Sequence, residues 1–578
     1  MNSFDRDYAR ELAYLREGSR NYAASHPHNA GHLASGGEDA DVERLLEGFA
    51  FISAGIRAHI DEAAGSFARR MLASLGPHWI RPTPPATVVE LRPDLRVLRS
   101  LQRMPRGKEL LAAPIHGVCA RFTTVADVDL LPIELVGLDL ERGRRGQATM
   151  RLRFRSSDAG APMIPEIDHL RLFIHHRDPT VAATLRMWLT RYCVAIDAEG
   201  GEPRVGEARV FIRQPFADPA ARMQPWPEAM PPAIRALVEG LAYPDFAGFV
   251  DVHGLGSLSL SGPEFGLVFT FKAAASAPSL PELPSSLPAG TVRLHCAPAL
   301  NLFQATGEPF EHLPGDRAHL LRADGVDPRY AEVYGVSELT MDGRLAEPRL
   351  CGVLPADERT ATYAVDRTCA EGERCEVRVS IEEASFLSSS DPAIGSTRIL
   401  CTNGDLAHSL GVGTLGHGPR HLLLAARTNI TPVTPPRRPD LGADRSWRLL
   451  DHLGQRSRML DSPAALRDLL GLHAPPSGGR REGGLLSPRS LQAVCGVRRR
   501  RSHQLVDGVP TPVVETTVEL DRRELSCVAE AELLGELLDR VIADFAGFDA
   551  ASVLTIRLFP GGEHLEWPLR RPDETPTP

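Results

Sequence analysis

The first 85 residues place apolar side chains with the period of an α-helix. Phe4, Tyr8, Leu12 and Leu15 recur every three or four residues, which puts them on one helix face. A second helical run follows and ends where prolines at 82, 84 and 85 forbid a helix. Its apolar positions, called the apolar stripe below, are Leu45, Phe49, Ile52, Ile56 and Ile60.

Beyond residue 86 the period changes to two, as in strands that bury one face. ATVVELRP, ATMRLRFRS and DHLRLFIHH alternate apolar and polar residues, whereas PTVAATLRMWLTRYC and PPAIRALVEGLAYP have helical spacing. The pattern predicts a multidomain α+β fold, with helices at the N-terminus and antiparallel β-rich domains after them. The predicted division is 1–85 helical and bundle-forming, 86–272 β-rich with inserted helices, 273–290 a Pro/Ser-rich loop, 291–472 a second β-rich domain, 473–490 a flexible linker and 491–578 a strand–helix–strand region.

The composition is that of a folded protein of several domains. The chain has 578 residues, 43% hydrophobic and 24% charged, and no apolar run long enough to span a bilayer. Its start lacks the apolar core of a secretory signal, so a cytoplasmic location without membrane insertion is expected. A net charge of −9 disfavours nucleic-acid binding. Nine scattered cysteines, of which Cys369 and Cys375 are closest, predict reduced thiols.

Three histidines in HPHNAGH raise the question of a metal site. His26, His28 and His32 fall within seven residues, and a metal-dependent hydrolase is therefore one alternative function. Zinc needs convergent ligands, however, and this segment is rich in helix-breaking residues, with no HExxH elsewhere. A solvated loop between two helices is favoured, and no metal ligand is predicted.

Other candidate motifs have equally plain interpretations. GVGTLGHG (411–418) has GxGxxG spacing but precedes a strand-like segment, so it lacks the helix that a dinucleotide site needs. Arg498–Arg501 would serve a nucleic-acid-binding adaptor, the second alternative, although a solvated strand edge or a contact to acidic groups is favoured. Asp127 and Asp129 lie in strand-like sequence, and nothing places them in a cleft. No catalytic or cofactor-binding residue is predicted.

Several segments together resemble one family along the whole chain. YARELAYLREGSRNYAASHPHNAGHL, DVERLLEGFAF, HCAPALNLF, CTNGDLAHSLG and TPPRRPDLG are similar, in this order, to the TssF (ImpG, VasA) family of the type VI secretion system baseplate. The positions that carry the likeness and are expected to be structural are Pro27, Gly31, Cys296, Pro298, Asn301, Leu302, Phe303, Asn403, Gly404 and Asp405.

The resemblance implies a structural protein without enzymatic activity, cofactor or small-molecule substrate. Members of the family are described as forming a wedge of two TssF copies with one TssG, and such wedges encircle the spike (VgrG) hub with TssK and TssE alongside. The wedge is a platform for tail sheath and tube assembly, as in contractile phage tails. The resemblance also implies a cytoplasmic protein docked at the inner-membrane complex through other baseplate subunits.

The apolar stripe has two interpretations at this stage. Most amphipathic helices cover their own domain, which favours a core inside the chain. The family's bundle shared between TssF and TssG favours a subunit interface instead, since obligate interfaces resemble a domain core cut in half. Burying five such side chains would contribute about 8–15 kcal/mol before the costs of association.

Overall fold

The structure of the chain is a computed structural model that describes residues 3–571 with internal gaps. The stretches outside the description are 27–39, 144–145, 157–167, 200–209, 216–220, 228–229, 259–262, 274–278, 314, 317, 349–359, 370–373, 383–391, 419–420, 455–457, 459, 475–484, 507 and 548–549. Pro27, Gly31, His28 and His32 therefore lie outside the described residues.

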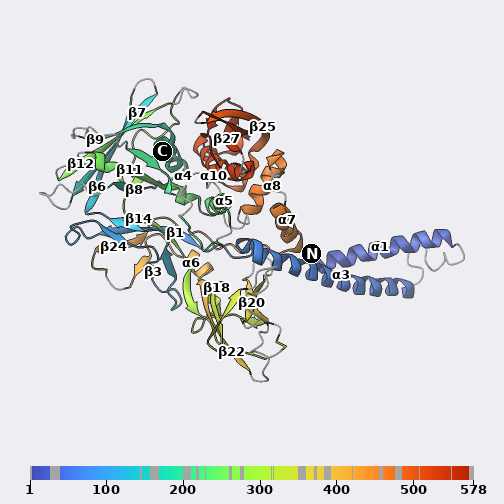
Figure 1. The fold of residues 1–578 in the computed structure, drawn as a ribbon. Helices are drawn as coiled ribbons and strands as arrows, with labels where there is room; N and C mark the ends of the chain where they lie inside the picture. The colour runs from blue at the N-terminus through green and yellow to red at the C-terminus, as the bar shows by residue number, and fades with distance from the viewer. Residues whose placement is uncertain are drawn as a thin grey trace.

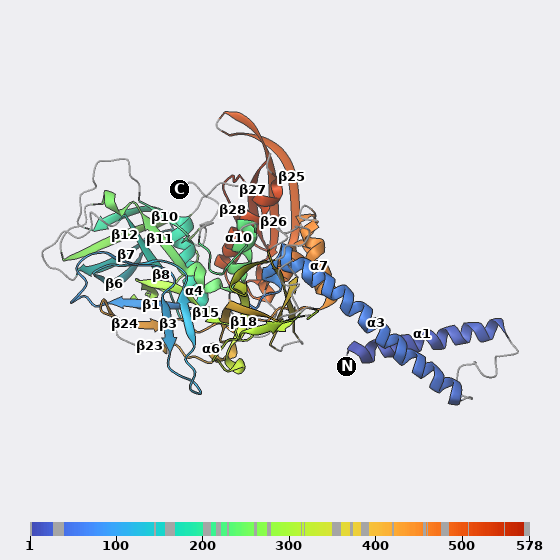
Figure 2. The ribbon, with the colours of Figure 1, turned by 60° about the horizontal axis from the view of Figure 1, so that its bottom comes forward.

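Two long N-terminal helices project from the rest of the molecule (Figures 1 and 2). They are α1 (Ser3–Ser25) and α3 (Ala40–Leu75), and together they are called the arm. The helices predicted before residue 85 are confirmed, and α3 ends before the Pro77–Trp79 turn, as the proline-rich sequence requires. The rest of the molecule is called the body. It contacts only the base of α3, where Leu72 packs with Ile80, Leu441, Leu449 and Leu472.

A six-stranded sheet, called the central sheet, lies beside the base of the arm (Figure 1). Its strands in spatial order are β23 (Leu415–His417), β3 (Glu109–Ala112), β4 (Arg121–Thr124), β14 (Cys296–Leu300), β1 (Ala86–Pro93) and β24 (Leu424–Asn429). The first six positions of β1 are buried, because β14 and β24 flank the strand and both faces are covered. The sheet joins segments more than 300 residues apart. The short pair β2 (Gln102–Met104) and β5 (Val128–Leu130) adjoins its core.

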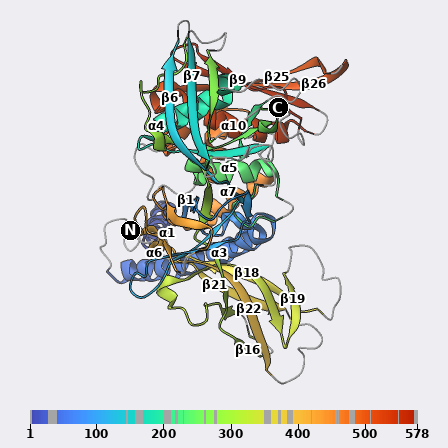
Figure 3. The ribbon, with the colours of Figure 1, turned by 90° about the vertical axis from the view of Figure 1, so that its left-hand side faces the viewer.

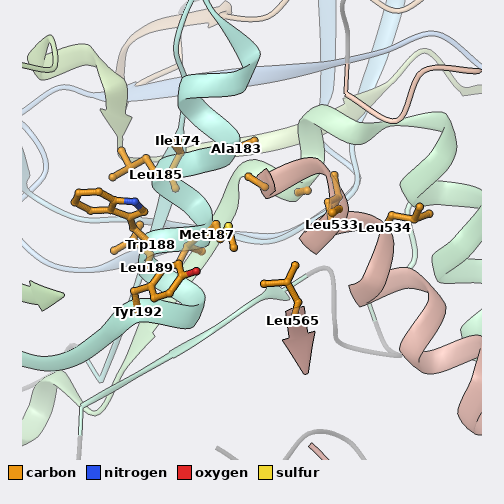
Figure 4. Close-up of a cluster of buried hydrophobic side chains, with 14 of the residues drawn as sticks. Ile174, Ala183, Leu185, Met187, Trp188, Leu189, Tyr192, Leu533, Leu534 and Leu565 are labelled. Atoms are coloured by element: carbon orange, nitrogen blue, oxygen red, sulfur yellow. The ribbon is translucent and has the colours of Figure 1, made fainter. Parts of the chain in front are cut away.

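Two four-stranded sheets and their helices form the next part of the body. One sheet consists of β6 (Ile133–Arg142), β7 (Gln147–Ser156), β12 (Glu264–Lys272) and β9 (Cys193–Glu199). The other consists of β10 (Phe211–Arg213), β11 (Phe249–His253), β8 (His169–Ile174) and β13 (Val292–Arg293). The two predicted helices appear as α4 (Pro179–Met187), which continues as a π-turn over Trp188–Tyr192, and α5 (Pro232–Ala242). Leu185 and Trp188 point into a core that also receives Leu533 and Leu534 (Figure 4).

An eight-stranded sheet forms a separate lobe (Figure 3). Its strands are β15 (Phe303–Thr306), β22 (Ala393–Thr402), β18 (Glu332–Met341), β19 (Arg344–Pro348), β20 (Thr362–Thr368), β21 (Glu376–Glu382) and β17 (His319–Leu320), with β16 (Phe310–His312) paired to β22. Burial alternates along β22, so one face of the sheet forms the core of this lobe and the other is exposed.

The C-terminal region confirms the predicted strand–helix–strand pattern and adds a strand before it. β25 (Val494–Val506), β26 (Val509–Asp521), β27 (Ala551–Phe559) and β28 (His564–Glu566) form one sheet, with β26 and β27 parallel because α10 (Val528–Ala546) crosses between them. The remaining helices are α6 (Asp405–His408), α7 (Ala443–Gly454), α8 (Pro463–His473) and α9 (Pro488–Gln492); short helical turns occupy Pro244–Gly248, Leu255–Ser257, Ala289–Thr291, Pro328–Tyr330 and Arg522–Glu524.

The prediction that all cysteines are reduced is wrong at one pair. Cys369, directly after β20, and Cys375, directly before β21, form a disulfide, with their Cα atoms 4.3 Å apart. The two strands pair in register as far as Thr368 and Glu376, which brings the cysteines within bonding distance although their spacing matches no familiar motif. The other six described cysteines are free thiols.

Candidate functional site: the apolar face of the arm

The apolar stripe is exposed to solvent along the whole arm. The exposed fractions are 62% for Leu45, 60% for Phe49, 58% for Ile52, 56% for Ile56 and 62% for Ile60. The interpretation of the stripe as a core inside the chain is therefore wrong: none of these side chains is buried by the body or by α1. Monomeric proteins rarely leave so large a contiguous apolar surface uncovered.

The opposite face of α3 is the one that packs on α1. At about 100° per residue, Ala50 and Ala54 lie roughly 80–180° around the helix from the stripe. Both alanines are fully buried, and Leu12 of α1 is 9% exposed. Because Ala50 and Ala54 are small, the two helices can approach closely at this face. The five stripe residues lie outside this contact.

Ion pairs and aromatic contacts hold α1 against α3. The Arg16 guanidinium binds Glu43, with Nε 2.9 Å from Oε1, and Arg57 binds Glu11. Phe4 packs edge-to-face on Phe51 at a ring-centroid distance of 5.2 Å. These contacts use none of the five stripe residues, so the stripe is free to meet another surface.

The stripe continues toward the body through an aromatic pair. Phe67 is 55% exposed, lies on the same side of α3 as the stripe, and approaches Trp447 of α7 at 6.3 Å between ring centroids. Nearby, Arg69 donates a hydrogen bond from Nη1 to the carbonyl oxygen of Leu441 at 3.3 Å. The body therefore contacts the arm at the base of α3 only, around Phe67, Arg69 and Leu72, and the apolar stripe lies beyond these contacts.

The family-motif asparagines join the central sheet to the eight-stranded sheet. Asn301 and Asn403 are buried. Asn301 Oδ1 accepts hydrogen bonds from Thr402 Oγ1 (2.7 Å) and the Asn403 amide (2.6 Å), while its Nδ2 donates to the carbonyl of Arg121 (2.7 Å) and to Asn403 Oδ1 (2.9 Å). Asn403 Nδ2 donates to the Tyr330 carbonyl at 2.8 Å. Asn403 Oδ1 also accepts from the Arg121 amide at 2.9 Å, so the hydrogen bonds of the pair link groups of the two sheets.

Gly404 and Asp405 complete the same junction. Gly404 has φ +54°, and a Cβ there would stand 2.5 Å from Glu332 Oε1, so a side chain at this position would strain the backbone and displace the carboxylate. Arg438 forms ion pairs with Glu332 and with Asp405 (2.8 Å), and Arg374 reaches the same two carboxylates at 3.4 and 3.9 Å. Glu332 and Arg374 lie outside the segments that carry the family resemblance, and Arg438 lies in one of them, TPPRRPDLG, without a predicted contact. Their spacing carries no signal, because only the fold brings them together.

The remaining motif residues lie where β14 leads into β15. Cys296 is buried and Pro298 sits opposite Val88 in the central sheet, where its carbonyl accepts from the Val125 amide at 3.0 Å. The Leu302 carbonyl accepts from Thr123 Oγ1 at 2.8 Å, and the Arg121 guanidinium lies over the Phe303 ring at 5.4 Å. These residues fix one chain crossing between two sheets.

The two alternative sites have different outcomes. His26 is exposed, and its ring stacks on Tyr22 at a centroid distance of 4.1 Å. His28 and His32 lie outside the described residues. Arg498–Arg501 lie on β25, an edge strand, which agrees with the favoured interpretation. Arg498 pairs with Glu519 (3.3 Å) and Arg500 with Glu515 (3.2 Å), so carboxylates of this chain already partly neutralise the run.

Two further sequence expectations can be compared with the structure. The glycine segment 411–418 contains β23, and the next described element is the strand β24 and not a helix, as expected. Asp127 and Asp129, however, do line a pocket of about 200 Å³. Arg103 binds Asp129 with Nε 2.8 Å from Oδ1, and Asp127 Oδ1 accepts from the Arg106 amide at 2.8 Å. Both acids serve these internal contacts.

The described chain is thus a multidomain α+β protein with a projecting helical arm whose large apolar face is bare. None of the helices within the described ranges is long and apolar enough to cross a membrane. A profile of the family described as "Type VI secretion system, TssF" matches residues 1–573. The chain therefore belongs to the TssF family of the type VI secretion system.

Individual relatives agree with this assignment. The chain is 26% identical to type VI secretion system component TssF1 of Pseudomonas aeruginosa over a 639-residue alignment covering 97% of each protein. Its fold is similar to a chain of a TssK–TssF–TssG baseplate subcomplex solved by cryo-electron microscopy, with a TM-score of 0.73, 24% identity, and coverage of 91% of this chain and 98% of that one. A second match, a type VI secretion baseplate complex, has a TM-score of 0.62 and 22% identity and covers 98% and 100%.

Proposed function

We propose that this chain is a non-catalytic structural subunit of a type VI secretion baseplate and that the apolar stripe of the arm is its main assembly surface. The observation that carries the proposal is the 56–62% exposure of five large apolar side chains on one face of a helix that its own chain leaves uncovered. A helix face of this kind is suited to an intersubunit bundle, because its burial supplies the driving force and its shape supplies the register.

TssG is the partner expected on this face. The similar solved chain belongs to a subcomplex of TssK, TssF and TssG, and for this chain we extend the proposal to a wedge of two copies with one TssG. TssK, TssE and the VgrG spike hub are the further neighbours. In this arrangement the wedge is the platform for sheath and tube assembly, in the cytoplasm and docked at the inner-membrane complex through other subunits.

Two copies in one wedge occupy non-equivalent positions, and we infer that connections between domains absorb the difference. The arm suits this role, since its base alone is held by the body through Leu72 and its neighbours. A pivot at this base would let the same stripe meet two different surfaces.

Copurification tests the assembly surface directly. Tagged chain carrying Phe49→Asp, coexpressed with TssG, should lose TssG because a charge replaces an apolar side chain at the centre of the stripe. Leu422→Asp is the matched control, since Leu422 is 83% exposed on the body, away from the arm, and should retain TssG. Normal TssG recovery by a folded Phe49→Asp protein would contradict the proposal.

A further inference from the structure

Two histidines and an aspartate meet at the far end of the eight-stranded sheet. His312 is the last residue of β16, His319 is the first of β17, and Asp316 lies in the turn between them. Nδ1 of His312 lies 2.9 Å from Nε2 of His319, and Oδ2 of Asp316 lies 4.0 Å from the same nitrogen. One donor atom from each residue falls within 4.8 Å of the other two.

The surroundings hold these three side chains in place. His312 is 3% exposed, and its Nε2 atom is buried with no hydrogen-bond partner. The Phe310 ring stacks on His319 at 4.3 Å and 18°, and Asp316 Oδ2 accepts a hydrogen bond from the Leu313 amide at 2.8 Å. The ring positions are therefore set by packing, so little side-chain ordering would remain to be done when a ligand binds.

The distances are close to those of a shared metal ion. Two imidazole nitrogens bound to one tetrahedral Zn²⁺ ion at about 2.0–2.1 Å are roughly 3.3 Å apart. The separation between the His312 and His319 nitrogens would open by about 0.4 Å, and that between Asp316 Oδ2 and His319 Nε2 would close by about 0.7 Å. Two imidazoles and one carboxylate are the donor set of borderline divalent transition metals, and water would fill the fourth position.

Sheet topology gives such an ion a definite structural effect. β16 pairs with β22 near one end of the strand order, whereas β17 pairs with β21 at the other end. His312 and His319 therefore belong to opposite ends of the same sheet. An ion bound by both would link the two ends of the sheet through side chains, at a point where the strands are only two or three residues long.

We propose that His312, Asp316 and His319 bind one divalent transition-metal ion, with Zn²⁺ as the representative, and that this ion staples the two ends of the eight-stranded sheet. The proposal is independent of the assembly surface on the arm. It concerns a different histidine cluster from His26, His28 and His32 and implies no hydrolytic reaction.

The test is metal binding by the full chain after chelation and dialysis. Titration with Zn²⁺ should saturate at one equivalent and raise the thermal unfolding midpoint, and Co²⁺ should give the visible absorption of a four-coordinate site. Asp316→Asn should weaken Zn²⁺ binding at least tenfold. Asp316 lies at the surface of the turn, so this variant should fold; His319→Gln should abolish the Co²⁺ band.

The control variant is His26→Gln/His28→Gln/His32→Gln. It should bind Zn²⁺ with the same stoichiometry and affinity as the unsubstituted chain. Loss of zinc from this variant, with Asp316→Asn unaffected, would assign the metal to the N-terminal histidines and overturn the proposal. Absence of both saturable Zn²⁺ binding and the Co²⁺ band in the unsubstituted chain would overturn it as well.

Discussion

Substitutions on the two faces of α3 should have different effects: those on the stripe should weaken binding to TssG, and those on the alanine face should lower the stability of the free chain. The informative variant is Ile52→Ala/Ile56→Ala/Ile60→Ala, which trims three stripe residues to methyl groups. Each isoleucine is 56–62% exposed, so slightly more than half of its surface remains for a partner to bury. Full burial of such a side chain contributes about 1.5–3 kcal/mol, and the remaining part is therefore about 1–2 kcal/mol per residue.

The expected loss in affinity is large and the expected loss in stability is small. Three residues at about 1–2 kcal/mol each give about 3–6 kcal/mol. A tenfold change in Kd corresponds to about 1.4 kcal/mol, so binding to TssG should weaken by more than about 100-fold. Alanine favours helix more than isoleucine does, so the arm itself should not unfold. Binding of the variant to surface-immobilised TssG gives the Kd, and thermal unfolding of the free chain gives its stability.

Ala54→Leu on the buried face is the opposite perturbation. Ala54 is fully buried against α1, so a larger side chain would force the two helices apart and lower the stability of the free arm by about 1–3 kcal/mol. The reasoning is refuted if the triple alanine variant keeps the Kd for TssG within a factor of about three, or if it destabilises the free chain as strongly as Ala54→Leu does.

Three further predictions concern Glu239, Asn301 and Gly404 in the body. Burial raises the pKa of Glu239 to about 7 from 4.5, so the stability that the protonated side chain contributes is present below pH 4.5 and lost as the pH rises through 7. Glu239→Gln can still accept a hydrogen bond from Trp226 Nε1 and stays uncharged. In urea unfolding this variant should therefore be more stable than the unsubstituted chain by about 3 kcal/mol at pH 8 and by about 1 kcal/mol or less at pH 5. Asn301→Leu should lower the urea midpoint by the equivalent of at least about 3 kcal/mol, because the Asn403 amide and other buried groups lose their partner; Asn301→Ala with a wild-type midpoint would contradict this. Gly404→Ala should cost about 1–3 kcal/mol by the same assay, from its positive φ and the contact with a carboxylate.

The motif residues were identified from sequence without their contacts. HCAPALNLF and CTNGDLAHSLG marked Asn301 and Asn403 as structural, yet the two are 102 positions apart and meet only because β14 and β22 end at the same crossing. Of their charged neighbours, Glu332 lies outside the segments that carry the resemblance, and Arg438 lies in TPPRRPDLG with nothing to indicate which carboxylates it binds. The same applies to His312 and His319: their seven-residue separation resembles no metal motif, and only the fold shows that their rings lie together.

The sequence by itself determined the helical period of the arm, the strand period of the body and the place where proline ends α3, since these depend on residues a few positions apart. It also placed the stripe on one face of a helix. Whether that face was covered depended on whether distant segments fold back over it, and local periodicity carries no information on that. Only the tertiary structure decided that α1 covers the alanine face and that the body holds only the base of α3, leaving five large apolar side chains in solvent.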